Sequence, residues 1–528
     1  MITKLVYTSL VLFILYALML ALGSNQKYPE KVYYNNFFPY LADKPLSEDG
    51  YLTLTVAWNI AEGKGITYNF NRHTTGIQPF SGFIFAAIAK VVIAAGGDKI
   101  DFVRVIIIFS MLIEVLFFVV IMRISRKLSP GIENKWLYLS SVIFTLLNFE
   151  LLVYFTNGLE TGIYLVCVGV SLLYSINYFR YEKKIYQSVA LGAVFGICSL
   201  ARIDFFVVVA ALLLINLYKR RLSITQCFTV GITSVVIIAP WILYIYKTTG
   251  SLMQSSARAE TSWMNNENFL MRIKAMSFAI MQHMTPNITT GNKDNALIVV
   301  FIITVVIVYK YLYNKKILSQ FDKDNIKIFG TWSIGILLLL CTYLLYSTAY
   351  YFYIRYIAPL LLIILPLLTV LLAVKLKELS KKTIQFGYLL VAIAFLVQAF
   401  LYFHSGRLAE QQSLRMAYLK NHFNNKAIVG CFQSGVTGYY DSNVYNLDGK
   451  MDHVVKKYIA SGNLARFIDS TGINVIIDWN EIVNAFDVNC LKNNYLKNYW
   501  TVYSNDIGDS HTVCLIRKNI SANILTGK

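Results

Sequence analysis

The chain has 528 residues, of which 56% are hydrophobic and only 15% are charged. Soluble domains average roughly 45–50% apolar residues, and this sequence repeats apolar runs of about 20 residues, the length that spans a bilayer. The formal net charge of +19 would suit a nucleic-acid-binding protein. Most of the lysines and arginines, however, lie in short loops between apolar runs, as the positive-inside rule predicts. The composition therefore predicts a polytopic membrane protein and excludes nucleic acid as the partner.

The first apolar run, residues 5–22, is either a signal peptide or an uncleaved first helix. No small-residue cleavage site follows it, so we expect an uncleaved helix. Basic segments between the later runs set the topology, because they should share the cytoplasmic side. These segments are 123–135, 180–184, 219–221, 310–327 and 375–382.

The run at 77–95 conflicts with this topology, because a span there would move every later basic segment to the exterior. It contains Pro79 and Lys90 and suits an interfacial helix on the outer membrane surface. Eleven spans remain, with the N-terminus inside and the C-terminus outside, and 187–200 is short for a span. They are 5–22, 102–122, 136–155, 160–178, 187–200, 203–218, 223–246, 296–313, 329–350, 353–374 and 384–403.

Three long segments then face the exterior: 23–101, 247–295 and 404–528. The last has a globular composition, with short apolar runs typical of strands and with amphipathic helical stretches between them. The expected strands are 427–432, 474–479, 500–504 and 511–517, and the expected helices lie at 405–423, 450–470 and 480–498. We predict an all-α polytopic module over 1–403 and a small exterior α/β domain over 404–528.

Two adjacent acids, Glu48 and Asp49, open EDGYLTLTVAWNIAEGKG in the first exterior segment. Neighbouring carboxylates repel and lose solvation beside a bilayer, so one of them should have a raised pKa. Acid–base chemistry at the membrane surface is one reason for such a pair. Capping of the following helix, which also suits Ser47, is the other, but it explains only one acid well. The same segment supplies further candidates for substrate binding: Arg72, His73 and Gln78.

Glu160, in TNGLETG at the outer end of a span, is another acidic candidate. It either faces the first exterior segment or only complements the dipole at a helix start. Arg202 and Asp204 lie in SLARIDFF at a second outer turn. A membrane arginine is costly and usually paired. These two residues therefore either pair with each other or present Arg202 to a phosphate group.

Two more arginines belong to the exterior face: Arg258, in the second long segment, and Arg355, in YFYIRYIAP. The forked guanidinium suits phosphate. The alternatives are a surface loop charge for Arg258 and snorkelling to the interface for Arg355. No Walker loop, HExxH or nucleophile elbow is present. Acids and arginines on one face suit a lipid-linked phosphate leaving group, with a carboxylate that deprotonates an acceptor hydroxyl.

In order along the chain, these motifs resemble the bacterial GT-C glycosyltransferases, relatives of protein O-mannosyltransferases and of the lipid A aminoarabinose transferase. EDGYLTLTVAWNIAEGKGITYNFNRHTTGIQPFSGFIFA is similar to their first periplasmic loop, and NGLETGIYLVCVGVSLLYS to their second acidic motif. ARIDF resembles their R-P-D turn, and IRYIAPLLLIILPLL their R-Y-x-x-P helix. SGVTGYYDSNVYNLDGKMDHVV resembles their distal exterior segment.

The resemblance implies juxtamembrane helices in the first exterior segment and inverting transfer from a polyprenyl-phosphate sugar to a hydroxyl. Glu48 or Asp49 would be the general base; the family usually has Asp at the first of these positions. Glu160 would orient the acceptor or, with this pair, bind a divalent cation, which some relatives use; no cofactor is required for certain. Ile203 replaces the usual proline of the R-P-D turn. The implied substrate-binding residues are Arg72, His73, Gln78, Arg202, Asp204, Arg258, Arg355 and Tyr356, with Arg202, Arg258 and Arg355 on the lipid phosphate.

Other functions stay open. A transporter or flippase of lipid-linked glycans should carry polar residues or broken helices at the midplane, where this chain is mostly apolar, with Glu114 as an exception. An assembly protein with an exterior sensor domain would not need the acidic pair, and an oligosaccharide ligase or polymerase remains within the enzyme class. We expect a multi-pass protein of the bacterial cell membrane with a periplasmic or extracellular C-terminal domain. Its partners would be a polyprenyl-phosphate-linked sugar, an envelope glycan, lipid or protein acceptor, and membrane lipids.

Overall fold

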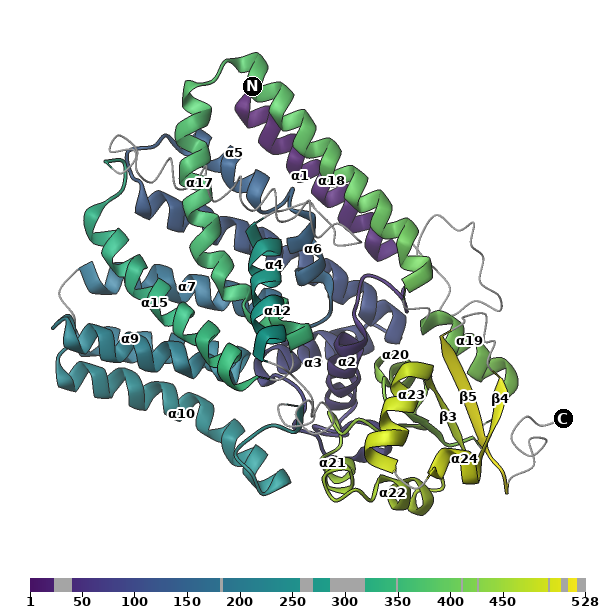
Figure 1. Ribbon diagram of the computed structural model, residues 1–528. Coiled ribbons are helices and arrows are strands. Elements are labelled where there is room, and N and C mark those ends of the chain that lie inside the picture. Colours follow the sequence, from purple (N-terminus) through teal and green to yellow (C-terminus); the bar gives the residue numbers. More distant parts are fainter. Residues whose placement is uncertain are drawn as a thin grey trace.

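The computed structural model describes residues 1–22, 40–180, 184–256, 269–284, 319–347, 350–409, 412–424, 427–491, 494–504 and 511–519. These residues form a large helical module and a small α/β domain at the C-terminal end of the chain (Figure 1). Arg258 and the expected span 296–313 lie outside the described residues.

The helical module contains long apolar helices and several short helices that connect them. Its α-helices are α1 (Ile2–Leu22), α2 (Glu48–Ala61), α3 (Pro79–Ala94), α4 (Lys99–Leu128), α5 (Asn134–Phe144), α6 (Phe149–Thr156), α7 (Thr161–Arg180), α8 (Ile185–Ala201), α9 (Phe206–Tyr218), α10 (Ile224–Thr249), α12 (Phe269–Met284), α15 (Lys323–Tyr346), α16 (Tyr353–Tyr356), α17 (Leu361–Glu378) and α18 (Lys381–Ala409). Short 3-10 turns are η1 (Asn69–Asn71), η2 (Ile203–Phe205), η3 (Tyr350–Phe352) and η4 (Ala358–Leu360).

The described helices confirm the polytopic all-α prediction. Seven of the described helices are long and apolar enough to span a membrane, and an eighth span is counted if α5 and α6, which are bent by 67° relative to each other, cross it together. The expected spans 187–200 and 203–218 are shorter apolar helices, α8 and η2 with α9. Helix α3 has 16 residues, which is too few to span a bilayer. This agrees with the prediction that 77–95 does not cross the membrane. The total of eleven stays a prediction, because one of the expected spans is not described.

Basic loops that are far apart in the sequence meet at one end of the module. The Asn325 side chain donates a hydrogen bond to the Lys127 carbonyl at 2.7 Å, which joins the end of α4 to the start of α15. Arg180, at the end of α7, lies 3.6 Å from Asp322 at the same place. These contacts confirm that the basic segments after α4, after α7 and before α15 share one end, as the charge pattern predicts.

The C-terminal domain is built around a mixed five-stranded sheet in the order β2-β1-β3-β5-β4. β2 and β3 run parallel to β1, whereas β5 runs antiparallel to β3 and to β4. The strands are β1 (Val429–Cys431), β2 (Val444–Asn446), β3 (Val475–Trp479), β4 (Trp500–Ser504) and β5 (Thr512–Arg517). The helices are α19 (Gln412–His422), α20 (Gly435–Tyr440), α21 (His453–Ala460), α22 (Leu464–Ser470), α23 (Asn480–Phe486) and α24 (Tyr495–Tyr499), with a π-turn η5 (Asp487–Leu491).

All four strands expected in this domain are confirmed, and β2 is an addition. Its sequence, VYN, lacks the apolar run that marked the other four strands. The boundary at 403 does not coincide with a helix end, because α18 continues to Ala409. A continuous helix therefore leads out of the module toward the domain (Figure 1).

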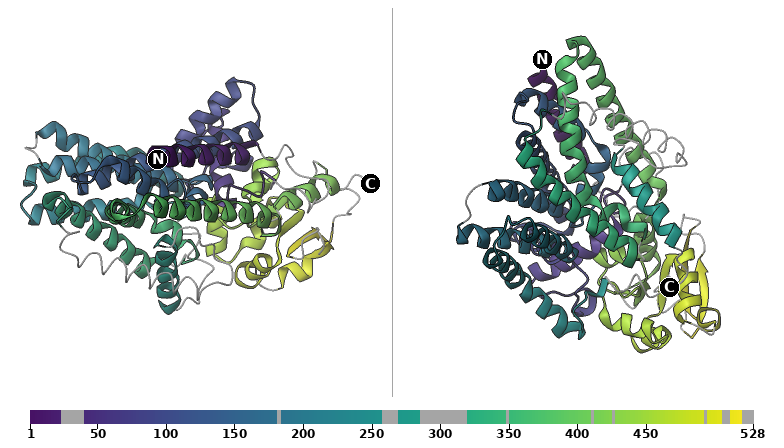
Figure 2. Two further views of the ribbon diagram at one scale, coloured as in Figure 1. Left: turned by 90° about the horizontal axis from the view of Figure 1, so that it is seen from above. Right: turned by 60° about the vertical axis from the view of Figure 1, so that its left-hand side comes forward.

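Hydrogen bonds connect the first exterior segment to the C-terminal domain. The Tyr68 hydroxyl donates to the Ser434 carbonyl at 2.9 Å, and the Asn69 amide donates to the Val444 carbonyl at 2.9 Å. These contacts place α20 beside α2, where the domain meets the helical module (Figures 1 and 2). The domain therefore covers the acidic pair at the start of α2.

Candidate active site

The start of α2 is capped by a serine. The Ser47 hydroxyl accepts a hydrogen bond from the Gly50 amide at 3.1 Å and donates one to the Asn157 carbonyl at 3.0 Å. A side chain at position 50 would collide with this loop, because its Cβ would lie 2.2 Å from the Asn157 oxygen. Capping thus falls to Ser47, and the close contact brings the loop before α7 against the first turn of α2.

The Glu48 side chain points into the C-terminal domain. Its carboxylate accepts hydrogen bonds from the backbone amides of Gly435 and Val436 at the start of α20. Burial raises the pKa of Glu48 to about 7, although the nearby Arg415 and the two amides oppose this shift. This confirms that one acid of the pair has a raised pKa, with burial as the main cause.

The Asp49 side chain has different partners. One of its carboxylate oxygens lies 3.4 Å from an Arg355 nitrogen, and the other lies 3.3 Å from the Lys450 ammonium. Burial alone would raise the pKa of Asp49, but Lys450 and Arg355 outweigh it and hold this pKa below its usual value. Asp49 is therefore ionised at neutral pH between two cations.

Glu160, Arg202 and Asp204 form a buried ion cluster. The Arg202 guanidinium lies 2.5 Å from Glu160 and 2.7 Å from Asp204. The Tyr343 hydroxyl, from α15, donates a further hydrogen bond to Asp204. Of the two alternatives for Arg202 and Asp204, the structure shows the mutual pairing, and Glu160 makes a second carboxylate contact with Arg202. Arg202 is thus neutralised by protein groups on two sides.

The ring of Tyr356 connects the two charged groups. It lies 4.8 Å from the Arg202 guanidinium and 5.5 Å from that of Arg355, within cation–π range. It also stacks on Tyr343 with ring centroids 5.2 Å apart. The structure therefore gathers most of the catalytic and phosphate-binding residues predicted from sequence: Asp49, Glu160, Arg202, Asp204, Arg355 and Tyr356.

Sequence reasoning missed three residues of this cluster: Lys450, Tyr343 and Phe352. The Lys450 ammonium and the Arg355 guanidinium lie 5.3 Å and 4.8 Å from the Phe352 ring. Lys450 lies in the tail segment that resembles the family's distal exterior region, but it is one of many lysines. Only the docking of the C-terminal domain reveals its place.

The other first-segment candidates make their contacts elsewhere. Arg72 pairs with Asp452 at 2.9 Å, at the junction with the C-terminal domain. His73 is exposed and forms a backbone bridge to Thr67. Gln78, at the start of α3, has its amide nitrogen 3.5 Å from the Gln254 side chain. In these contacts, Arg72, His73 and Gln78 have no partner in the charged cluster.

Glu48, Asp49 and Glu160 face different partners in the described structure. Within the described ranges, no three His, Cys, Asp or Glu side chains lie close enough together to hold a metal ion. Glu48 accepts amide hydrogens and Glu160 pairs with Arg202, so neither is oriented to share a cation with Asp49. These three carboxylates are therefore not arranged as one ligand set in the described structure.

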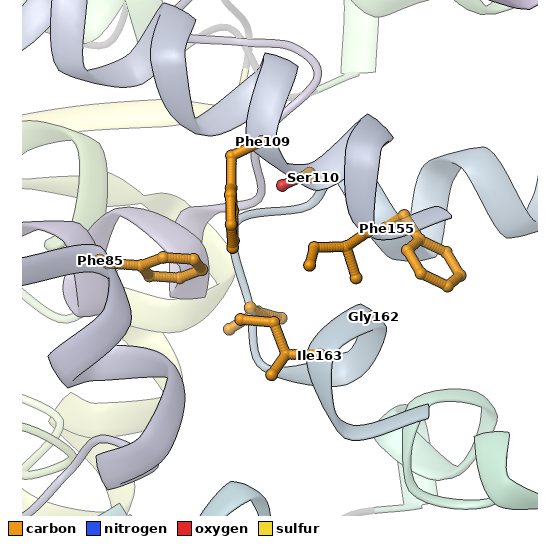
Figure 3. Close-up of a pocket in the computed structure, with 8 residues that line it drawn as sticks. Phe85, Phe109, Ser110, Phe155, Gly162 and Ile163 are labelled. Carbon is orange, nitrogen blue, oxygen red and sulfur yellow. The ribbon is translucent and has the colours of Figure 1, made fainter. Parts of the chain in front are cut away.

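A small apolar pocket lies between α3, α4, α6 and α7. Phe85, Phe109 and Ile163 converge on it, and its lining includes only the Ser110 hydroxyl as a polar side chain (Figure 3). Leu159, next to Glu160, also lines it. Apolar surface thus adjoins the loop that carries one of the site's acids.

The protein is a polytopic helical module with a small C-terminal α/β domain, and the charged cluster lies where the two meet. No protein-family model matches the chain, and no curated protein matches its sequence. Solved structures share its fold. ArnT from Cupriavidus metallidurans in the apo state matches with a TM-score of 0.56 and 11% identity, over 96% of this chain and 97% of that one.

Two ligand-bound structures match as well. ArnT from the same organism bound to undecaprenyl phosphate gives a TM-score of 0.53 at 12% identity, again over 96% and 97% of the chains. The archaeal oligosaccharyltransferase AglB from Archaeoglobus fulgidus, with an inhibitory peptide and a dolichol-phosphate, gives 0.52 at 11% identity. That match covers 94% of this chain and 73% of AglB. At these identities the likeness shows a common fold.

Proposed function

We propose that this protein is a GT-C-type glycosyltransferase that uses a polyprenyl-phosphate-linked sugar. The observation that carries the proposal is the ionised Asp49 carboxylate next to Arg355, on the first exterior segment. The fold supports it, because the similar structures hold undecaprenyl phosphate or a dolichol-phosphate. The acceptor is the hydroxyl of an exterior glycan, lipid or protein.

In the proposed reaction, Asp49 is the general base. It takes the proton of the acceptor hydroxyl while the acceptor oxygen forms a bond to the anomeric carbon. The bond from that carbon to the phosphate oxygen breaks, and its electron pair leaves with the polyprenyl phosphate. Arg355 neutralises the charge that develops on this leaving group. A single displacement of this kind inverts the anomeric configuration.

Glu48 has an anchoring role in this proposal. Its carboxylate accepts two backbone amides of α20, from Gly435 and Val436, so its oxygens are occupied by the C-terminal domain. A base must present an oxygen to the acceptor. Asp49 makes only loose contacts, at 3.3 and 3.4 Å, and is the better candidate.

Arg355 is a stronger candidate than Arg202 for the phosphate ligand. Arg202 is paired closely with both Glu160 and Asp204, whereas Arg355 has one loose carboxylate contact. The Nε atom of Arg355 is buried and has no hydrogen-bond partner among the described residues. A buried donor without a partner is costly, and a phosphate oxygen would satisfy it. Arg202 would then fix Glu160 and the Tyr356 ring beside the reaction centre.

The test is the conservative variant Asp49→Asn. A general base contributes roughly 100-fold or more to a rate, so we expect transfer to fall by at least that factor. Membranes should accumulate polyprenyl-phosphate sugar and lack one residue on the acceptor glycan, both measured by mass spectrometry. The matched control is Glu62→Gln, at the end of the same helix, where the carboxylate pairs with Lys64 outside the cluster. An unchanged glycan profile in Asp49→Asn would remove the enzyme proposal's main support.

A transporter or flippase of lipid-linked glycans is the second candidate, and two observations favour it. The α5–α6 span is broken by a 67° bend, and broken spans line many transport sites. Glu114, on α4, is fully buried, and both of its carboxylate oxygens lack a hydrogen-bond partner in the described structure. Purified protein in vesicles that moves a polyprenyl-phosphate sugar across the bilayer, and does so equally as Asp49→Asn, would favour transport.

A further inference from the structure

The C-terminal domain carries a lysine into the charged cluster. Lys450 lies in the turn between β2 and α21, where the Asp448 side chain accepts the Lys450 amide at 2.8 Å. Gly449 takes a left-handed conformation with φ of +79°, which an L side chain rarely adopts. The turn therefore has a defined shape that directs Lys450 away from the sheet.

The backbone of Lys450 is held by both exterior segments of the helical module. The Ser255 hydroxyl donates to the Lys450 carbonyl at 2.8 Å. On the other side, a Cβ at Gly76 would lie only 2.3 Å from the same carbonyl oxygen, so the first segment is in direct contact with it. Three segments distant in sequence thus set the position of one lysine.

The Lys450 side chain is nearly buried, with 11% exposure, and lies beside two carboxylates. The ammonium lies 3.3 Å from Asp49 and 3.9 Å from Asp448. Strong charge-assisted hydrogen bonds measure about 2.7–2.9 Å. An ammonium has three donors, so Lys450 can donate to a phosphate oxygen as well as to a carboxylate.

Asp49 lies between Lys450 and Arg355, with one carboxylate oxygen toward each cation. A carboxylate held by two cations is a weak base, because both stabilise its ionised form. A phosphate placed beside Arg355 would offer Lys450 a more highly charged partner than a carboxylate. If Lys450 turned to that phosphate, Asp49 would lose a counter-ion and become more basic.

We propose that Lys450 is a ligand of the donor's phosphate, supplied by the C-terminal domain. On donor binding, its ammonium moves from Asp49 to the phosphate. There it neutralises the leaving group together with Arg355, and Asp49 is released to accept the acceptor's proton. The domain is thus part of the catalytic centre. This inference rests on the proposed glycosyltransferase function and names a further residue of the same site.

The test measures binding of undecaprenyl phosphate and of uncharged undecaprenol to the full-length protein in nanodiscs. We expect Lys450→Met to weaken undecaprenyl phosphate binding roughly 10-fold or more, the usual effect of a lost hydrogen bond to a charged group. Undecaprenol binding should not change. Lys450→Arg should restore most of the affinity. Lys457→Met, on the exposed side of α21, is the matched control for loss of one positive charge and should bind as the parent does.

The same comparison in the Asp49→Asn background separates direct from indirect action. If Lys450 touches the phosphate, Lys450→Met still weakens binding by about the same factor there. If Lys450 acts only as the counter-ion of Asp49, the loss disappears in that background and the inference is wrong. A parent protein that binds the phosphate no better than undecaprenol overturns the proposed function itself. If the parent prefers undecaprenyl phosphate and Lys450→Met binds it as tightly as the parent does, only the role of Lys450 is overturned.

Discussion

Two consecutive carboxylates, Glu48 and Asp49, have opposite environments. Successive residues of a helix are about 100° apart around its axis, so the first turn of α2 directs them at different neighbours. Glu48 is buried against the C-terminal domain, and this burial raises its pKa to about 7 although two backbone amides oppose the shift. Asp49 meets Lys450 and Arg355, which keep its pKa low. Neighbours brought by folding therefore divide an apparently equivalent pair into an anchor and a candidate base.

The raised pKa of Glu48 predicts a pH-dependent stability. The folded protein holds a proton on Glu48 up to about pH 7, whereas a glutamate exposed to water has a pKa of 4.5. Folding stability should therefore fall as the pH rises through this window, by roughly 3 kcal/mol for this group once the pH exceeds 7. Glu48→Gln should remove this dependence. Thermal unfolding of both proteins between pH 5 and pH 8.5 measures it.

Glu62→Gln provides the comparison for that experiment, because it removes a carboxylate from the same helix outside the docking surface. It should keep the parent's loss of stability between pH 5 and pH 7. If the stability of the parent and of Glu48→Gln changed with pH in the same way, Glu48 would be ionised in the folded protein throughout this range.

At the scale of elements, the contact between α2 and α20 depends on the absence of a side chain. A Cβ at Gly435 would lie 1.9 Å from the Glu48 carbonyl oxygen. Its φ is not in the left-handed region, so the requirement for glycine comes from space. The approach lets the amides of Gly435 and Val436 reach the Glu48 carboxylate. The start of α20 is thereby fitted against the turn that carries Asp49.

Gly435→Ala is therefore expected to displace α20 from α2. Overpacking of this kind typically costs about 1–3 kcal/mol, and the shift should also move Lys450 away from Asp49. We expect a lower unfolding temperature and a loss of transfer activity. Gly387→Ala is the control, since a Cβ there meets nothing within 4 Å. Equal stability and activity of the two variants would show that the helices adjust without cost.

At the scale of the whole molecule, the charge pattern and the site lie at different ends of the helical module. The end of α4 meets the start of α15 at Asn325, while the C-terminal domain covers the start of α2 at the other end (Figure 2). Exposed apolar residues on α1, α10 and α18 suit the lipid around the module, among them Val11, Val235 and Phe386. The positive-inside rule then predicts that the site lies on the outer face.

This topology predicts which added cysteines an impermeant maleimide can reach. Lys64→Cys, after α2, should react in intact spheroplasts, and Arg126→Cys, at the end of α4, should react only after lysis. Both side chains are exposed. The unmodified protein is the background control, because six of the seven native cysteines are buried or partly buried and the exposed Cys341 lies in a span. A reversed labelling pattern would put the candidate site in the cytoplasm.

Much of this architecture is encoded locally and was predictable. The length and apolarity of the runs determine the long helices, because the bilayer demands about 20 apolar residues per span. Short apolar runs likewise marked four of the five strands. The sequence did not predict β2, which has no apolar run, or that α18 continues without a break past residue 403 to Ala409. The break between α5 and α6 was also missed, because the run from 136 to 155 contains no proline or glycine.

The sequence by itself determined the membrane class, the grouping of basic loops at one end and the candidate acids and arginines. Each of these follows from residue type and local spacing. Only the tertiary structure separated Glu48 from Asp49, neutralised Arg202 with two carboxylates and brought Lys450 to the site. The reason is physical: the Lys450–Asp49 ion pair joins residues about 400 positions apart. Such a contact is set by the docking of two folded units and by the close approach at Gly76 and Gly435, which no local pattern encodes.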